Sequence, residues 1–178
     1  ANLPEDFTPN KRLKSVLKKR GGSFTDGDID WGWGELLAFG SLAEQGKFVR
    51  LAGEDSQRGT FTQRHAVLYN PDNAEPYNPL DHNAQENGDG GHFQVFNSAL
   101  TEYAGMGFEY GYTLGNKEAV VAWEAQFGDF ANGAQTIIDE YVSSSETKWG
   151  EMSSLIALLP HGYEGQGPDH SSARIERY

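Results

Sequence analysis

Two histidines flank a glycine-rich loop with two carboxylates near the end of the chain. His161 and His170 are nine residues apart, with Glu164 and Asp169 between them. Histidine changes its charge near neutral pH, so these side chains could transfer protons or hold an anionic substrate. A metal site is a second interpretation, although this spacing matches no usual pair of histidine ligands and no third ligand is evident. In a third interpretation, both rings only satisfy hydrogen bonds of the loop.

Glu102 is a second candidate for proton chemistry. It lies in the first turn of a helix predicted over 99–113, capped by Ser98, whose neighbouring side chains are mostly apolar. The simpler interpretation is a carboxylate that is stabilised by the helix dipole. In the sharper one, a carboxyl group in a dry pocket shares a proton with a ligand. The residue types leave both open.

Aromatic and basic residues could complete a ligand site. Phe127 and Phe130 could belong to the core or form a platform for a flat ring. Arg58, Arg64 and His65 lie close together in the sequence, and they could provide the local positive charge that binds an anion. Taken singly, either arginine is more typical of a solvated surface group.

Predicted strands place these residues in space. Strands are predicted at 48–52, 93–96, 119–123 and 154–159, and the main helices at 31–45, 99–113 and 131–142. The last two strands are continuously apolar, which is typical of burial on both faces. Strands that alternate with helices favour an α/β fold with a parallel sheet. Ligands bind beyond the carboxyl ends of such strands, where most of the candidate residues lie.

The remaining segments are predicted to be less regular. The stretch 53–92 is rich in Gly, Asn, Asp and Pro and is predicted to be a long loop, and 171–178 reads as the first turns of a helix. Six of the 14 basic residues lie in 11–20. This segment predicts an amphipathic helix that packs on the body or on a neighbouring domain, with a membrane or polyanion contact as the alternative. A linker is predicted at Gly21–Ser23.

Bulk properties exclude several classes of protein. The 178 residues suit one domain, and the absence of cysteine excludes disulfides, thiolate metal sites and a cysteine nucleophile. A net charge of -12 argues against nucleic acid as the main partner. No apolar run reaches the length needed to span a membrane, and the acidic start does not resemble a secretory signal.

Three long strings resemble the thiamine-diphosphate-dependent component of 2-oxoglutarate dehydrogenase. They lie at 53–67, 123–132 and 158–174, within a match from about Ile29 to the end, and they are most similar to bacterial forms, some of which are fused to the succinyltransferase. The resemblance implies a three-layer α/β/α domain with a mostly parallel sheet, which binds the aminopyrimidine ring of the cofactor. It divides the chain into an N-terminal extension (1–28) and a pyrimidine-binding domain (29–178) that is truncated at its C-terminus.

The resemblance also implies roles for individual residues. Glu102 matches the glutamate that hydrogen-bonds the pyrimidine nitrogen, and Phe127 and Phe130 match the aromatic pocket for that ring. His161 and His170 match the histidines that face substrate and intermediates. The remaining candidates are Asp55 on the cofactor side, and Gln126, Arg64 and His65 near the substrate or intermediate.

The implied activity is oxidative decarboxylation of 2-oxoglutarate in the tricarboxylic acid cycle, with succinyl transfer to a lipoyl group. The expected cofactors are thiamine diphosphate and magnesium, with the magnesium held by a domain outside this chain. The expected partners are 2-oxoglutarate, a lipoyl domain and a second subunit of a homodimer, in the cytoplasm. The fragment alone is expected to be inactive. The alternatives are a non-catalytic structural or dimerisation module and a metal-dependent hydrolase.

Overall fold

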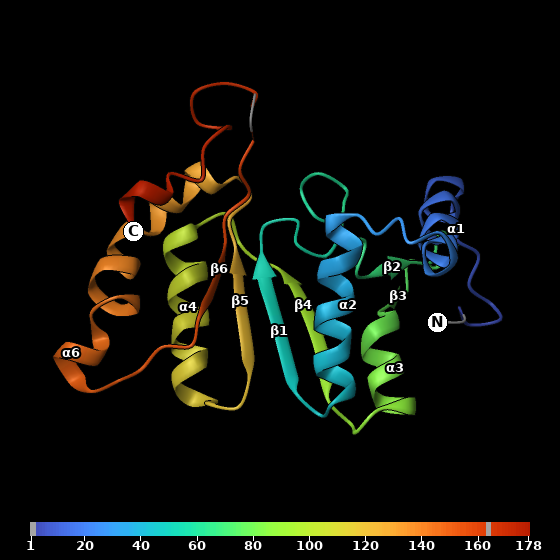
Figure 1. Cartoon of the computed structure of the whole chain (residues 1–178), viewed down its shortest axis with the longest axis horizontal. Helices are drawn as coiled ribbons and strands as arrows, with labels where there is room; N and C mark the ends of the chain where they lie inside the picture. Colours follow the sequence, from blue (N-terminus) through green and yellow to red (C-terminus); the bar gives the residue numbers. More distant parts are fainter. Residues whose placement is uncertain (1–2, 163–164) are drawn as a thin grey trace.

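A four-stranded parallel sheet forms the centre of the molecule (Figure 1). The structure, a computed structural model, describes residues 3–162 and 165–178, so Glu164 lies outside the described residues. The strand order is β4-β1-β5-β6, and each neighbouring pair is parallel. The strands are β1 (Phe48–Gly53), β4 (His92–Asn97), β5 (Val120–Glu124) and β6 (Ile156–Leu158). The predicted parallel sheet is confirmed.

Helices cover both faces of the sheet. On one face, α2 (Trp31–Glu44) and α3 (Pro79–Asn87) enclose a core that includes Val49 and Leu51. On the other, α4 (Glu102–Gly115) packs with Trp123 of β5 and with the helical segments that follow this strand. These segments are η1 (Gly128–Ala134), α5 (Gln135–Ile137), η2 (Ile138–Val142) and α6 (Ser145–Trp149). Since side chains alternate along a strand, one sheet serves both cores, and the predicted three-layer α/β/α fold is confirmed.

The two strands predicted to be buried on both faces behave differently. Residues Val121 to Glu124 of β5 are buried between two neighbouring strands and two layers of helices, as predicted. In β6, by contrast, Ile156 is 42% exposed. This prediction is wrong because β6 lies at the edge of the sheet and pairs only with β5. An apolar run does not distinguish a central strand from an edge strand.

The stretch predicted as a long loop contains regular structure. A small hairpin of β2 (Leu68–Tyr69) and β3 (Pro76–Tyr77) precedes α3. The Asn78 side chain caps α3 by accepting a hydrogen bond from Asp81 N, and Pro79 occupies its first turn. Asn followed by Pro is a recognised helix-start signal, so this helix was detectable from the sequence.

Three further helix predictions need correction. The helix predicted over 131–142 is divided into 3₁₀, α and π segments, and the one predicted over 171–178 is a single 3₁₀ turn, η3 (Ile175–Arg177). The cap of α4 is Thr101 rather than Ser98.

The basic N-terminal segment forms α1 (Lys11–Asp26), which runs through the predicted linker and ends at Gly27, with φ 74°. Its buried Leu13 packs with Phe7 and Leu68, which confirms that the helix packs on the body. All four lysines of α1 are exposed. Among the described residues, no helix is both long and apolar enough to cross a membrane.

Candidate functional site

The four strand ends form one row along the carboxyl edge of the sheet. Gly53 of β1 is the register partner of Asn97 on one side and of Glu124 on the other, and Glu124 is paired with Leu158. A Cβ atom on Gly53 would lie 2.3 Å from the carbonyl oxygen of Glu124, so only glycine permits this close approach. Segments that are far apart in the sequence therefore meet at the edge where ligands bind in parallel sheets.

Glu102 lies in a small hollow at this edge, which we call the carboxylate hollow. Its lining comprises Glu54, Ser98, Ala99, Thr101, Glu102, Trp123, Glu124 and Gln126. Gln126 Nε2 donates a hydrogen bond of 3.1 Å to Glu54 Oε1. A Cβ atom on Gly133 would lie 2.9 Å from Glu102 Oε2, so the glycine leaves room for this carboxylate. The structure thus brings together two predicted site residues, Glu102 and Gln126.

Phe127, Phe130 and His170 form a cluster of rings. The centroid of His170 lies 4.6 Å from that of Phe127 and 5.0 Å from that of Phe130, and the two phenyl rings are 5.6 Å apart. All three contacts are edge-to-face, a favourable arrangement for aromatic pairs. Both phenylalanines are half-buried, so they are not sealed in the core and can contact a ligand.

Buried Asp129 ties the glycine-rich loop to the segment after β5. Its Oδ2 accepts a hydrogen bond from Ser171 N at 2.8 Å, and its Oδ1 one from Arg174 Nε at 3.3 Å. His161 Nδ1 accepts from Ala173 N at 3.0 Å, so the neutral ring carries its proton on Nε2. His170 Nδ1 lies 2.7 Å from Asp169 Oδ1. Each histidine therefore uses Nδ1 within the loop and can offer Nε2 to a ligand.

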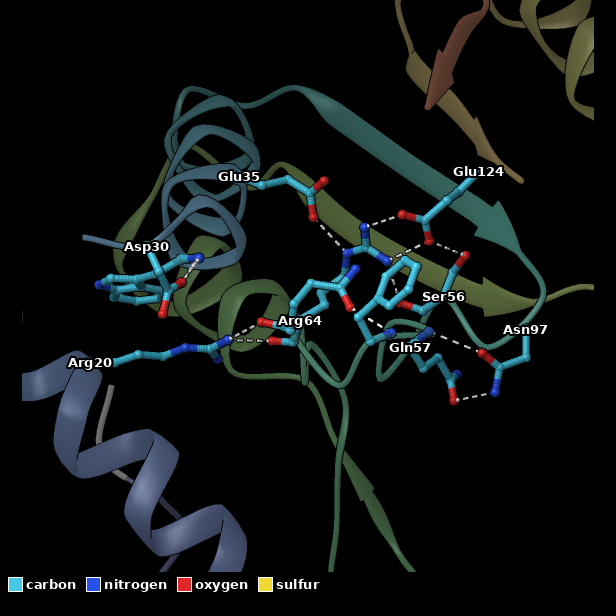
Figure 2. Close-up of polar contacts among 11 residues, drawn as sticks. Arg20, Asp30, Glu35, Ser56, Gln57, Arg64, Asn97 and Glu124 are labelled. Atoms are coloured by element: carbon cyan, nitrogen blue, oxygen red, sulfur yellow. Dashed lines mark hydrogen bonds and ion pairs between the residues drawn. The ribbon is translucent and has the colours of Figure 1, made fainter. Parts of the chain in front are cut away.

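Arg64 is fully buried, which the sequence did not predict. Its guanidinium donates to both carboxylate oxygens of Glu124, at 2.6 and 2.7 Å, and to Glu35 Oε1 at 2.6 Å (Figure 2). Burial alone would lower the pKa of Arg64, but hydrogen bonds and charge from Glu124 and Glu35 outweigh it and raise the pKa. The interpretation of Arg64 as a solvated surface group is wrong. Four of its five N–H groups donate to Glu35, Glu124 and the Ser56 carbonyl, so in this structure Arg64 holds other residues in place.

The remaining candidates, Asp55, Arg58 and His65, do not line the carboxylate hollow. Asp55 has a left-handed backbone, with φ 56°, and pairs with exposed Arg58 at 2.9 Å. His65 lines a mainly apolar hollow beneath α1, together with Arg20 and Trp33. Burial lowers the pKa of His65, and the positive charges of Arg20, Arg58 and Arg12 lower it further.

We expect this histidine to make the stability of the fold depend on pH. The pKa of folded His65 lies below its ordinary value of 6.5, so the unfolded chain takes up the proton first. The neutral ring therefore contributes its full stability above pH 6.5. This contribution is lost as the pH falls from 6.5 toward the lower pKa of the folded state. Denaturation midpoints of the 178-residue chain and of His65→Gln, measured from about pH 8 to about pH 5, should show a steeper acid loss for the wild type. If the denaturation midpoints of the wild type and of His65→Gln fell in parallel with pH, this prediction would be contradicted.

A family model described as "Transketolase, pyrimidine binding domain" matches residues 27–178. The chain belongs to this family. The "2-oxoglutarate dehydrogenase E1/E2 component" of Corynebacterium glutamicum is 71% identical over 178 residues, which cover 100% of this chain and 15% of that protein. The "Multifunctional 2-oxoglutarate metabolism enzyme" of Mycobacterium sp. (strain JLS) is 54% identical over 179 residues, which cover 99% of the chain and 14% of that protein. The resemblance read from the sequence is confirmed.

Membership in the pyrimidine-binding family indicates which part of the chain forms the domain and which cofactor the site could bind. The match starts at residue 27, directly after the end of α1 at Asp26. The family and its relatives support thiamine diphosphate as the cofactor. The site fits such a ring, because a carboxylate in a hollow and half-buried aromatic rings lie along one edge. Within residues 3–162 and 165–178, no three histidine or carboxylate side chains gather in a way that could hold a metal ion.

Proposed function

We propose that this chain supplies the pyrimidine-binding half of the active site in a thiamine-diphosphate-dependent 2-oxoglutarate dehydrogenase. The observation that carries the proposal is the position of η1. This segment contributes Phe130 to the cluster of rings and also lies against Glu102. Phe130 and Gly133 both lie in η1, and Gly133 packs against the Glu102 carboxylate. A carboxyl group near two half-buried phenylalanine rings supports this proposal, because an aminopyrimidine needs a polar contact on its edge and an apolar contact on its face.

Each side chain has a distinct task in this proposal. Bound thiamine diphosphate supplies the electron sink for loss of carbon dioxide. Glu102 hydrogen-bonds a pyrimidine ring nitrogen and shares a proton with it, while Phe127 and Phe130 hold the ring. His161 and His170 present Nε2 to the substrate, where they hold its negative charge or transfer a proton. Gln126 contacts the reacting groups.

The rest of the active site belongs to other parts of the enzyme. In our proposal the diphosphate and its magnesium are held by a domain outside this chain, on the second subunit of a homodimer, with Asp55 toward the cofactor. The substrate is 2-oxoglutarate, and the succinyl group passes to the lipoyl group of a succinyltransferase, in the cytoplasm. The names of the relatives support this assignment, since both refer to 2-oxoglutarate.

The full-length enzyme tests this function directly. Carbon dioxide release from 2-oxoglutarate should require added thiamine diphosphate and magnesium, and pyruvate should be a poor substrate. The 178-residue chain alone should show no turnover. If the full-length protein binds no thiamine diphosphate, the proposal is wrong and a non-catalytic module becomes the better description.

Replacing His170 by alanine should impair turnover more than cofactor binding. We expect kcat in the full-length enzyme to fall by about 10²-fold, the lower end for loss of a proton-transfer group, with cofactor affinity within a few-fold of the wild type. His82→Ala is the matched control, because this exposed histidine lies on α3. Unchanged kcat combined with lost cofactor affinity would show that the ring serves the cofactor instead.

A further inference from the structure

Glu124 lines two hollows at the carboxyl edge. On one side it lines the carboxylate hollow with Glu102 and Gln126. On the other it lines a larger hollow with His161 and the exposed ring of Trp31. The position of Glu124 therefore affects both the proposed cofactor side and the proposed substrate side of the site.

Arg64 holds Glu124 in a single orientation (Figure 2). Both carboxylate oxygens accept from the guanidinium, and Glu124 Oε2 also accepts from Ser56 Oγ at 2.9 Å. Arg64 Nη1 additionally donates to the carbonyl of Ser56 at 2.9 Å, which secures the turn after β1. Two parallel hydrogen bonds from a planar fork fix both distance and direction. Glu124 is 5% exposed, so water cannot replace these contacts easily.

This arrangement leaves Glu102 as the carboxylate that can respond to a ligand. Three carboxylates line the hollow, and Glu124 is neutralised by Arg64 while Glu54 accepts from Gln126. Within the described ranges, no side chain hydrogen-bonds or pairs with the Glu102 carboxylate. If Arg64 were lost, Glu124 would carry an uncompensated charge beside Glu102 and could turn into the hollow.

Arg20 of α1 supports Arg64 from behind. Its Nη2 donates to the carbonyl oxygens of Gln63 at 3.0 Å and of Arg64 at 2.6 Å. The Arg20 guanidinium lies 5.2 Å from the ring centroid of Trp33, and the side chain is 9% exposed. A continuous set of contacts thus runs from α1 through the backbone of Arg64 to the end of β5.

We propose that Arg64 is a positioning residue for the pyrimidine site, and that Arg20 supports it from α1. The inference rests on the proposed function. Arg64 acts through Glu124: it keeps this carboxylate ordered and neutralised, so that the hollow offers Glu102 to the cofactor. A purely structural arginine would contribute to stability without affecting how tightly the cofactor binds.

The test compares two arginines that each form a bidentate pair with a glutamate in the full-length enzyme, Arg64 in the loop after β1 and Arg50 within β1. Arg50 of β1 forms a bidentate pair with Glu109 of α4, with side chains 12% and 3% exposed, and it lies in mid-strand rather than at the carboxyl edge. Lysine keeps the charge but cannot reproduce either bidentate contact. Arg64→Lys should weaken thiamine diphosphate binding to the apoenzyme by about 10- to 100-fold, as expected for a misplaced binding group. Arg50→Lys should lower the melting temperature while leaving that affinity within about twofold.

Cofactor affinity is measured by calorimetric titration with thiamine diphosphate at saturating magnesium, alongside the melting temperature of each variant. Arg20→Lys should shift the affinity in the same direction by a smaller factor, and it repeats the test if Arg64→Lys does not fold. Lys18→Ala, on the exposed side of α1, should change nothing. Equal affinities in the wild type, Arg64→Lys and Arg20→Lys would overturn the positioning role alone, whereas a wild type that binds no cofactor would overturn the proposed function.

Discussion

Replacing Glu102 by glutamine in the full-length enzyme should lower decarboxylation of 2-oxoglutarate by about 10²- to 10⁴-fold, the range for loss of an essential proton-transfer group. Glutamine keeps the size of the side chain and its place in the first turn of α4, but it cannot share a proton. The fold should be unaffected, because no described side chain depends on the Glu102 carboxylate. The measurement is initial rate at saturating thiamine diphosphate, with the melting temperature as a check on folding.

The helix-dipole interpretation of Glu102 has its own control. Glu146 also lies in the first turn of a helix, α6, and is exposed. Glu146→Gln removes a similar favourable contact with a helix N-terminus, so it should change stability slightly and activity not at all. If Glu102→Gln behaves like Glu146→Gln, with near-normal turnover, the assignment of Glu102 to the cofactor is wrong.

The largest stability loss should follow from Arg64→Met. Removal of one partner of a buried ion pair typically costs about 3–5 kcal/mol, because the remaining charge is left without compensation. Here Glu124 would be that charge, and Glu35 would lose its contact as well. Urea denaturation of the 178-residue chain measures the change in the free energy of unfolding.

Arg58→Met provides the comparison within the same loop. Arg58 pairs with Asp55, but these side chains are 48% and 46% exposed. Exposed pairs contribute only about 0–1 kcal/mol, since water solvates both charges after the pair is broken. Similar small losses in both variants would contradict the view that the Arg64 contacts stabilise the fold.

Much of the fold was evident in local sequence patterns. Apolar runs located the strands, and the helix predicted over 31–45 corresponds to α2 (Trp31–Glu44). The alternation of strands and helices then placed the candidate residues at one edge. Errors arose where a strand is short, as for β2 and β3, where an Asn-Pro helix start lies within a loop-like stretch, as for α3, or where burial depends on neighbours, as for β6.

The sequence by itself determined the family, the α/β class and the edge of the sheet at which the site lies. Periodicity and capping report local structure and the burial of one face, and these depend on residues that are close in the chain. The tertiary structure alone decided the role of Arg64, whose partner Glu124 is 60 residues away. It also revealed Glu102 as the carboxylate of the hollow that no described side chain contacts by a hydrogen bond or an ion pair. An ion pair forms where the fold brings two charges together, and no local pattern in the sequence encodes that contact.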